Sequence, residues 1–169
     1  MVLGADDFRR VLGHFASGVT IVTTRDTAGR PAGLTASAFT SVSLNPPLVL
    51  VCVAHNAQSY ETLRDADRFA INILEVGQEA LSNRFATKSS TAAEKFQGVA
   101  HKDGALGLPL LSDALAHLEC STAHAYPGGD HTIFVGQVEA ASSRADEGPE
   151  PLLYYRGRYN RLRTPGGSR

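Results

Sequence analysis

Polar and apolar residues alternate between Gly33 and Leu44. The odd positions carry hydroxyl groups and one aromatic ring, and the even positions are apolar with Thr40 as the exception. Successive side chains of a strand point to opposite faces of a sheet. The pattern therefore predicts one extended segment with an apolar face and a hydroxyl-rich face. It ends at Asn45, because the two prolines that follow cannot donate hydrogen bonds to a sheet.

A continuous apolar run, Leu48–Ala54, comes next and is typical of a strand covered on both sides. The hydroxyl row before it has two interpretations. It is either a solvated sheet face or a groove that offers short donors to a flat polar ligand. In the second case the small residues Ala36 and Ala38 would let a ring lie close to the backbone. Composition does not choose between the two.

Helical spacing is found near the start of the chain, where Asp6 or Asp7 can cap a helix and Gly18 can end it. Its apolar residues, spaced three and four apart on one face, are Phe8, Val11, Leu12 and Phe15. A second helix is expected after Asn56, which is a plausible N-cap. A third is expected over Gln78–Ala86.

Short strands make up most of the remaining pattern, and turn residues punctuate them. The turns at 26–30 and 126–130 predict two hairpins, the small polar segment 87–93 predicts a loop that could act as a lid, and 142–151 predicts an acidic loop. This combination favours an antiparallel barrel with a few peripheral helices. Further strands are predicted at Val19–Thr24, Phe69–Leu74, Ala114–Ser121, His131–Glu139 and Leu152–Tyr155.

Length and charge limit the possible functions. The 169 residues fit a single domain, 1–169, with a core from about 8 to 159 and a flexible tail at 164–169. A formal net charge of -1 gives no electrostatic argument for binding nucleic acid. No apolar run is long enough to span a bilayer, and residues 1–7 lack the features of a secretory signal. We therefore expect a cytoplasmic protein, in which Cys52 and Cys120 are free thiols.

Several catalytic signatures are missing from the sequence. It contains no P-loop and no glycine-rich dinucleotide fingerprint between a strand and a helix. The six histidines do not fall in HExxH spacing and there is no CxxC pair, so no metal site is expected. Flavin chemistry needs none of these signatures, because the cofactors themselves make and break the bonds.

Three segments resemble one known family in sequence and in order: GLTASAFTSVSLNPPLVLVCV, GGDHTIFVGQVE and PLLYYRGRY. The family is that of flavin reductases with an FMN-binding split barrel, and the resemblance runs from about Phe8 to Tyr159. It implies a mostly β, antiparallel, Greek-key-like split barrel. It also implies hydride transfer from NADH or NADPH to FMN, or to FAD, and delivery of reduced flavin to a separate flavin-dependent monooxygenase. Members are typically homodimers with flavin sites near the subunit interface.

The resemblance also implies flavin-binding positions. The outward amides that follow Asn56 suit a phosphate, since helix N-termini attract anions. Arg84 could clamp a phosphate or could be a solvated surface residue. The positions expected to line the flavin are Thr35, Ala36, Ser37 and Ala38. Those expected to meet its ring edge are Cys52, Val53 and Ala54. Those expected near its phosphate, ribityl chain or ring periphery are Asn56, Ser59, Arg84 and Phe85.

A GDH motif at 129–131 matches the position that the family associates with the nicotinamide nucleotide, which makes His131 the candidate catalytic residue. The sequence alone favours the simpler interpretation, in which His131 is a residue that closes a hairpin. Tyr155 and Arg156 are weaker candidates beside the site. Two alternative functions stay open: a non-catalytic flavin-binding or electron-carrier module of the same fold, and an oxidase similar to pyridoxamine-phosphate oxidase.

Overall fold

A seven-stranded antiparallel sheet forms the body of the protein in the computed structural model, which describes residues 3–89, 91–144 and 150–162. Its strand order is β3-β2-β6-β9-β10-β5-β4. The strands are β2 (Thr20–Arg25), β3 (Pro31–Ala36), β4 (Phe39–Leu44), β5 (Pro47–Ala54), β6 (Arg68–Ile73), β9 (Ala116–Gly128) and β10 (His131–Ser143). The predicted mostly β, antiparallel architecture is confirmed.

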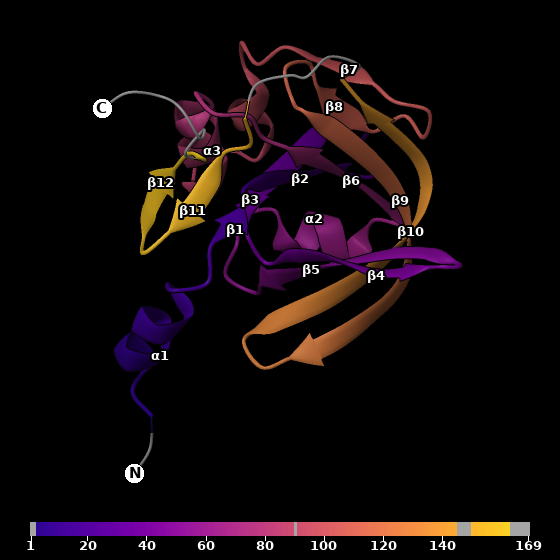
Figure 1. The fold of residues 1–169 in the computed structure, drawn as a ribbon. Coiled ribbons are helices and arrows are strands. Elements are labelled where there is room, and N and C mark those ends of the chain that lie inside the picture. The colour runs from indigo at the N-terminus through magenta and orange to yellow at the C-terminus, as the bar shows by residue number, and fades with distance from the viewer. Residues whose placement is uncertain (1–2, 90, 145–149, 163–169) are drawn as a thin grey trace.

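Two small sheets and four helical segments complete the fold (Figure 1). One small sheet consists of β1 (Ser17–Gly18), β11 (Leu153–Tyr155) and β12 (Arg158–Asn160), and the other of β7 (His101–Asp103) and β8 (Pro109–Leu111). The helical segments are α1 (Ala5–Leu12), α2 (Tyr60–Asp65), α3 (Glu79–Ala86) and the 3₁₀ helix η1 (Ala93–Phe96).

The connection between β3 and β4 forces the sheet to close. These strands lie at opposite ends of the strand order, yet only Ser37 and Ala38 separate them in the chain. A link this short spans at most about 11 Å, so the sheet must curl until its two edges are close. Backbone pairing joins β3 to β2 and β4 to β5, with no ladder between β3 and β4 among the described strands. The barrel is therefore split along this line.

The apolar interior of the barrel surrounds α2, which Figure 1 shows between the two curled halves of the sheet. Tyr60 and Leu63 of α2 pack with buried residues of the strands, including Val51 and Phe69. Asn72 of β6 is fully buried as well. Its side-chain amide donates to the carbonyl oxygen of Ile21 at 3.0 Å, and its side-chain oxygen accepts from a backbone amide of β8 at 2.8 Å. These hydrogen bonds give Asn72 a structural role.

The central alternating segment differs from the prediction, because it forms two strands instead of one. Leu34 and Ala36 of β3 are buried, as the alternation predicts. After the bend at 37–38, Val42 and Leu44 are 50% and 94% exposed, so the predicted apolar face does not continue. The physical reason is topological. The bend moves the chain to the opposite edge of the sheet, and a bulge between Ser41 and Ser43 shifts its register against β5.

Strand β5 forms as predicted but is fully covered on one face only. Val49, Val51 and Val53 are buried, whereas Leu50 and Cys52 are half-buried. The prediction of equal coverage on both faces is therefore wrong. It could not be corrected from the sequence, because both sets of side chains are apolar.

Helix α1 is shorter than predicted. It ends at Leu12, and Gly18 belongs to β1 instead, where it pairs with β11. Gly4 occupies the N-cap position, and Asp6 and Asp7 form ion pairs with arginines one turn later instead of capping the helix. The predicted apolar face exists but is largely uncovered in the described part of the chain. Its residues are exposed: Phe8 by 51%, Val11 by 58%, Leu12 by 54% and Phe15 by 81%.

Both predicted hairpins form. The β2–β3 hairpin turns at 26–30, and the β9–β10 hairpin has only Gly129 and Asp130 in its turn, so residues 126–128 are strand rather than turn. Segment 95–111 contains part of η1 together with β7 and β8. Strand β10 extends to Ser143. Positions 145–149 of the predicted acidic loop, and the predicted tail at 164–169, lie outside the described residues.

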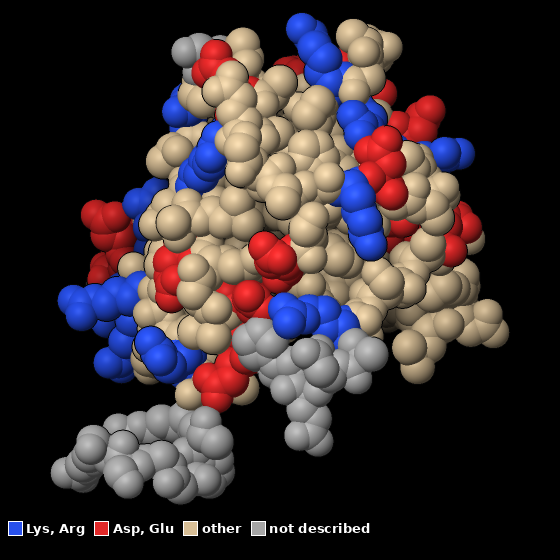
Figure 2. All heavy atoms as spheres, turned by 90° about the horizontal axis from the view of Figure 1, so that it is seen from above, with Lys and Arg blue, Asp and Glu red and all other residues tan. Residues whose placement is uncertain are grey.

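Acidic and basic side chains are interspersed over the face in Figure 2, among larger areas of uncharged residues. No large area of one sign forms on this face, in agreement with the net charge of -1. Among the described residues, no helix combines the length and the apolar composition that crossing a bilayer would require.

Close packing at Gly136 predicts a loss of stability on substitution. A Cβ at this position would lie 2.5 Å from the ring of Phe69 and 2.8 Å from Cβ of Cys120, both fully buried. We expect Gly136→Ala to lower the free energy of unfolding by about 1–3 kcal/mol, measured by urea denaturation. Gly18→Ala is the matched control, because a Cβ there meets nothing within 4 Å. Equal stability of the two variants would contradict the packing described here.

Candidate functional site

A cavity of about 360 Å³ opens at the split in the barrel, within the size range of small-molecule sites. Its walls come from the end of β3 and the bend after it, from the end of β5, from the turns that precede α2, and from the end of α3. His131 at the start of β10 and Lys95 in η1 complete the lining. The predicted groove of small and hydroxyl-bearing residues is thus a cavity wall.

The first wall is Thr35–Ala38. The hydroxyl of Thr35 donates to the carbonyl oxygen of Ser82 in α3 at 2.6 Å, which ties β3 to that helix. The carbonyl of Ala38 accepts from the backbone amide of Cys52 at 2.9 Å, the contact that holds the bend against β5. Ser37 is exposed, and within the described part of the chain its hydroxyl has no hydrogen-bond partner. This wall therefore offers one free hydroxyl beside small side chains.

The second wall consists of Cys52–Ala54 and His131, which pairs with Ala54 across the β5–β10 ladder. Gly129 has φ of 73°, a backbone conformation that glycine allows in the two-residue turn. His131 is the first residue after that turn. Its Nδ1 lies 2.6 Å from the carboxylate of Asp130, and this hydrogen bond lowers the pKa of Asp130. The imidazole stands at the cavity rim with Nε2 available to a ligand.

The turns before α2 form a third part of the wall, through Asn56, Ala57 and Gln58. The helix begins at Tyr60 with Ser59 as its N-cap, so the prediction of Asn56 as the N-cap is wrong. Ser59 is only 1% exposed, and its hydroxyl donates to the carbonyl of Gly33 at 2.8 Å. Its side chain therefore anchors α2 to β3 and does not line the cavity.

The end of α3 contributes a basic side of the cavity. Lys95 is 3% exposed and donates from Nζ to the carbonyl of Phe85 at 3.1 Å, near the negative end of the helix dipole. Burial lowers the pKa of Lys95. Among the described residues, the lining contains Lys88 as well and no aspartate or glutamate. A buried ammonium without a carboxylate partner favours an anionic ligand, since that ligand would offset its desolvation.

Ten of the thirteen positions predicted to bind the cofactor line this cavity, and three do not. Arg84 points to a different surface, where it donates to the carbonyls of Glu94 and Gln97. Tyr155 lies under Arg156, whose guanidinium carbon is 5.3 Å from the ring centroid. The third is Ser59. The lining residues that sequence reasoning missed are Leu34, Ala57, Gln58, Ala86, Thr87, Lys88 and Lys95.

The missed lysines carried no sequence signal. Lys88 and Lys95 lie in polar or irregular stretches, where solvated lysines are common. Gln58 brings part of this region to the cavity, because its side-chain amide makes two hydrogen bonds to the backbone of Ser89 at 2.7 and 3.0 Å. These bonds join the predicted loop to the turns before α2. Its proposed role as a lid stays a prediction.

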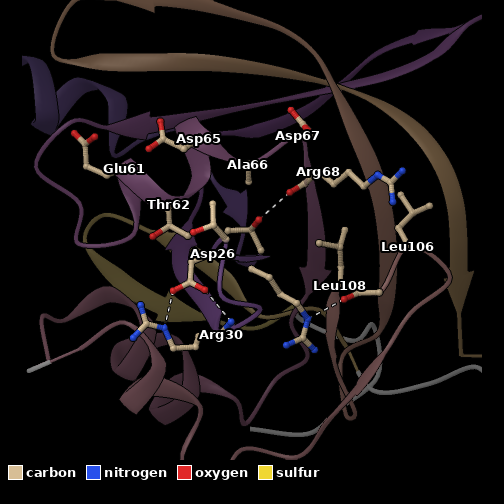
Figure 3. Close-up of a pocket in the computed structure, with 14 residues that line it drawn as sticks. Asp26, Arg30, Glu61, Thr62, Asp65, Ala66, Asp67, Arg68, Leu106 and Leu108 are labelled. Atoms are coloured by element: carbon tan, nitrogen blue, oxygen red, sulfur yellow. Dashed lines mark hydrogen bonds and ion pairs between the residues drawn. The ribbon is translucent and has the colours of Figure 1, made fainter.

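A larger groove of about 670 Å³ lies elsewhere on the barrel (Figure 3). Three of its charged side chains are held by other groups of the chain. Asp26 pairs with Arg30 at 2.7 Å, and hydrogen bonding to the Arg30 backbone is the main cause of the lowered pKa of Asp26. Arg25 donates to the carbonyl of Gly107 at 2.8 Å. None of the predicted site residues lines this groove, so the smaller cavity remains the candidate site.

The fold and the cavity together define a class: an antiparallel split barrel with a basic, hydroxyl-lined site at its split edge. Comparison with known proteins makes the class specific. A family model, that of the flavin reductase-like domain, matches residues 12–163 of the chain. The chain belongs to the flavin reductase-like domain family, and the resemblance noted in its sequence is confirmed.

Individual relatives agree with this assignment. The chain is 44% identical over 158 residues to a protein of Rhizobium meliloti named "Probable flavin reductase", covering 94% of the chain but only 49% of that relative. It is 38% identical to HsaB of Mycobacterium tuberculosis, the reductase subunit of a flavin-dependent monooxygenase, covering 90% of the chain and 79% of HsaB.

A solved structure gives the same fold. It is the NADH:FAD oxidoreductase SgcE6 of Streptomyces globisporus C-1027, in complex with NAD and FAD fragments. The TM-score is 0.87 with 40% sequence identity, and the alignment covers 99% of each chain. The predicted split barrel is confirmed.

The two free thiols predict a test of the cavity wall. Burial raises the pKa of Cys52, which lines the cavity, and raises that of Cys120 to about 12. A raised pKa leaves less reactive thiolate at a given pH. At pH 8 we expect iodoacetamide to modify Cys52 slowly and Cys120 not at all, as measured by mass spectrometry. FAD should slow the modification of Cys52 further. In urea both thiols should react alike, and a Cys52 rate unaffected by saturating FAD would contradict its place in the site.

Proposed function

We propose that this chain is an NADH-dependent flavin reductase that reduces FAD, or the smaller FMN, and releases the reduced flavin to a separate monooxygenase. The observation that carries the proposal is the basic cavity at the split edge, lined by small residues, hydroxyls and main-chain groups and free of carboxylates. SgcE6, similar over the full chain, is an NADH:FAD oxidoreductase, and HsaB is a monooxygenase reductase subunit.

The residues present fit a flavin. The small side chains of Ala36 and Ala38 leave room for a flat ring beside the backbone, and the main-chain groups of Cys52–Ala54 can meet a ring edge. Lys88 and Lys95 can neutralise a phosphate. When bound, flavin and nicotinamide supply the hydride chemistry themselves. The chain has to hold the two rings in register and exclude water, which is how orientation lowers a reaction barrier.

His131 is proposed to bind the nicotinamide nucleotide. It stands at the rim of the cavity, and its orientation is fixed by the hydrogen bond to Asp130 and by ladder pairing with Ala54 and Gly128. Nε2 is left for a ligand at the rim. Hydride transfer needs no proton from the protein, so the imidazole positions the donor and does not act as an acid or base.

We further propose that the working form is a homodimer in the cytoplasm. The apolar face of α1 and the outer residues of β4, Val42 and Leu44, are exposed in the single chain, and exposed apolar surface of this kind is typical of an interface. A second copy would cover it. Sedimentation of the purified protein as a monomer would contradict this assignment.

The proposed activity is tested by steady-state oxidation of NADH and NADPH with FAD and with FMN, followed by absorbance. We expect turnover that depends on added or bound flavin and is faster with NADH than with NADPH. Binding of flavin with no consumption of either nicotinamide would support the alternative of a non-catalytic flavin module. Binding of neither flavin would contradict the proposal altogether.

Substitution of His131 is expected to weaken the binding of NADH and to leave the binding of flavin unchanged. We expect His131→Ala to raise the KM for NADH about tenfold, because one hydrogen bond is worth about 1–1.5 kcal/mol, while the KM for flavin changes little. His124→Ala is the matched control, because that histidine is exposed and does not line the cavity. An unchanged KM for NADH in His131→Ala would remove this residue from the site.

A further inference from the structure

The basic side of the cavity includes Lys88, which lies on a short exposed segment beyond the end of α3. Thr87 and Lys88 are both exposed, so apolar packing does not hold this segment in place. Thr87 is tied back to the helix, because its amide donates to the carbonyl of Asn83 at 3.1 Å. Among the described residues, Lys88 itself makes no hydrogen bond. Its position therefore depends on how the chain is held at the next residue, Ser89.

Gln58 holds Ser89 through a pair of hydrogen bonds. Its side-chain amide donates to the carbonyl of Ser89 at 2.7 Å, and its side-chain oxygen accepts from the backbone amide of Ser89 at 3.0 Å. The side chain thus exchanges two hydrogen bonds with one backbone residue, as two residues do in a hydrogen-bonded pair of antiparallel strands. Two bonds fix the orientation of the segment as well as its distance from the turns before α2.

The backbone that carries Gln58 is itself fixed on both sides. The preceding residue, Ala57, donates from its amide to the carbonyl of Ala54 at the end of β5 at 3.0 Å. The following residue, Ser59, is buried and donates from its hydroxyl to the carbonyl of Gly33 in β3 at 2.8 Å. Gln58 lies half-buried between these two anchors and lines the cavity. Its side chain is therefore a fixed support for the exposed segment.

The two lysines of the basic side are held in different ways. Lys95 is buried, and its ammonium donates directly to the carbonyl of Phe85. Lys88 is exposed, and the bonds that fix it are made by its neighbours in the chain, Thr87 and Ser89. Ordering an exposed lysine on a free segment costs conformational entropy when an anion binds. A side chain that holds the segment in advance removes part of this cost and increases the affinity for the anion without touching it.

We infer that Gln58 is a positioning residue, which holds Lys88 at the cavity for the phosphate group of the flavin. The inference rests on the proposed function, because it takes the anion in the cavity to be a flavin phosphate. It gives Gln58 a role toward the phosphate and none toward the ring. Since Gln58 also lines the cavity, direct contact with the flavin is the alternative that the experiment has to separate.

The affinities for FMN and for riboflavin, which lacks the phosphate, separate these two roles. Gln58→Met keeps the length of the side chain and removes both hydrogen bonds to Ser89. We expect it to weaken FMN binding about tenfold and to change riboflavin binding less than about twofold, measured by quenching of flavin fluorescence. Gln97→Met is the matched control, because Gln97 is exposed and does not line the cavity. Equal losses for FMN and riboflavin, or no loss for either, would overturn the inference.

A double-mutant cycle tests whether Gln58 acts through Lys88. Lys88→Met alone should weaken FMN binding, because it removes a positive charge from the basic side of the cavity. In that background, Gln58→Met should weaken FMN binding less than about twofold further, since the residue that it positions is gone. Losses that multiply in the double variant would overturn the inference, because Gln58 would then act independently of the lysine.

Hydrogen exchange of the flavin-free protein gives a readout that needs no ligand. We expect the amides of residues 87–89 to exchange faster in Gln58→Met than in the wild type or in Gln97→Met, while the strands of the barrel keep their protection. Unchanged exchange in this segment would overturn the inference. A wild-type chain that binds neither FMN nor riboflavin would contradict the proposed function and this inference with it, whereas an unchanged FMN affinity in Gln58→Met would contradict the inference alone.

Discussion

The two-residue link between β3 and β4 is the constraint on which the structure depends. These strands are the outer edges of one sheet, and Ser37 and Ala38 are the only residues between them. The sheet therefore has to curl until its edges meet, and the hydrogen bond from the amide of Cys52 to the carbonyl of Ala38 holds the bend in place. Because the edges meet without a continuous ladder, the barrel keeps an opening along this line.

That opening explains why the site combines residues from distant parts of the sequence. The bend supplies small side chains and a free hydroxyl, and β5 supplies main-chain groups beside it. The hydrogen bond from the Thr35 hydroxyl to the Ser82 carbonyl holds helix α3 at the same edge. The end of α3 then brings Lys88, and through the Phe85 carbonyl Lys95, to the cavity. One closure thus assembles a neutral wall and a basic wall in a single cavity.

The C-terminal hairpin extends the same arrangement. Strand β11 pairs with β1 just before β2 begins, and β12 places Tyr159 against the hydroxyl of Ser82. The hairpin therefore borders α3 on the side away from the basic wall. This is why a second cleft, which shares Thr35 and Ser37 with the cavity, lies next to it.

Much of the fold could be predicted from local pattern. Period-two alternation identified β3, the apolar run identified β5, and glycine-rich turns identified both hairpins, because strand faces and turns are governed by neighbouring residues. The same reasoning failed at β4 and α1, where Leu44 and Val11 are apolar but exposed. An apolar face shows that a surface is to be covered, but it does not show what covers it.

The sequence by itself determined the antiparallel strands, the hairpin that presents His131, and through its motifs the family. Only the tertiary structure decided which polar residues share a cavity. Arg84 was a reasonable phosphate ligand from its sequence, yet the fold turns it toward the carbonyls of Glu94 and Gln97. Lys95 had no distinguishing pattern, yet it is buried at the site. The physical reason is that chain closure brings together residues from separate elements, and local periodicity carries no information about such distances.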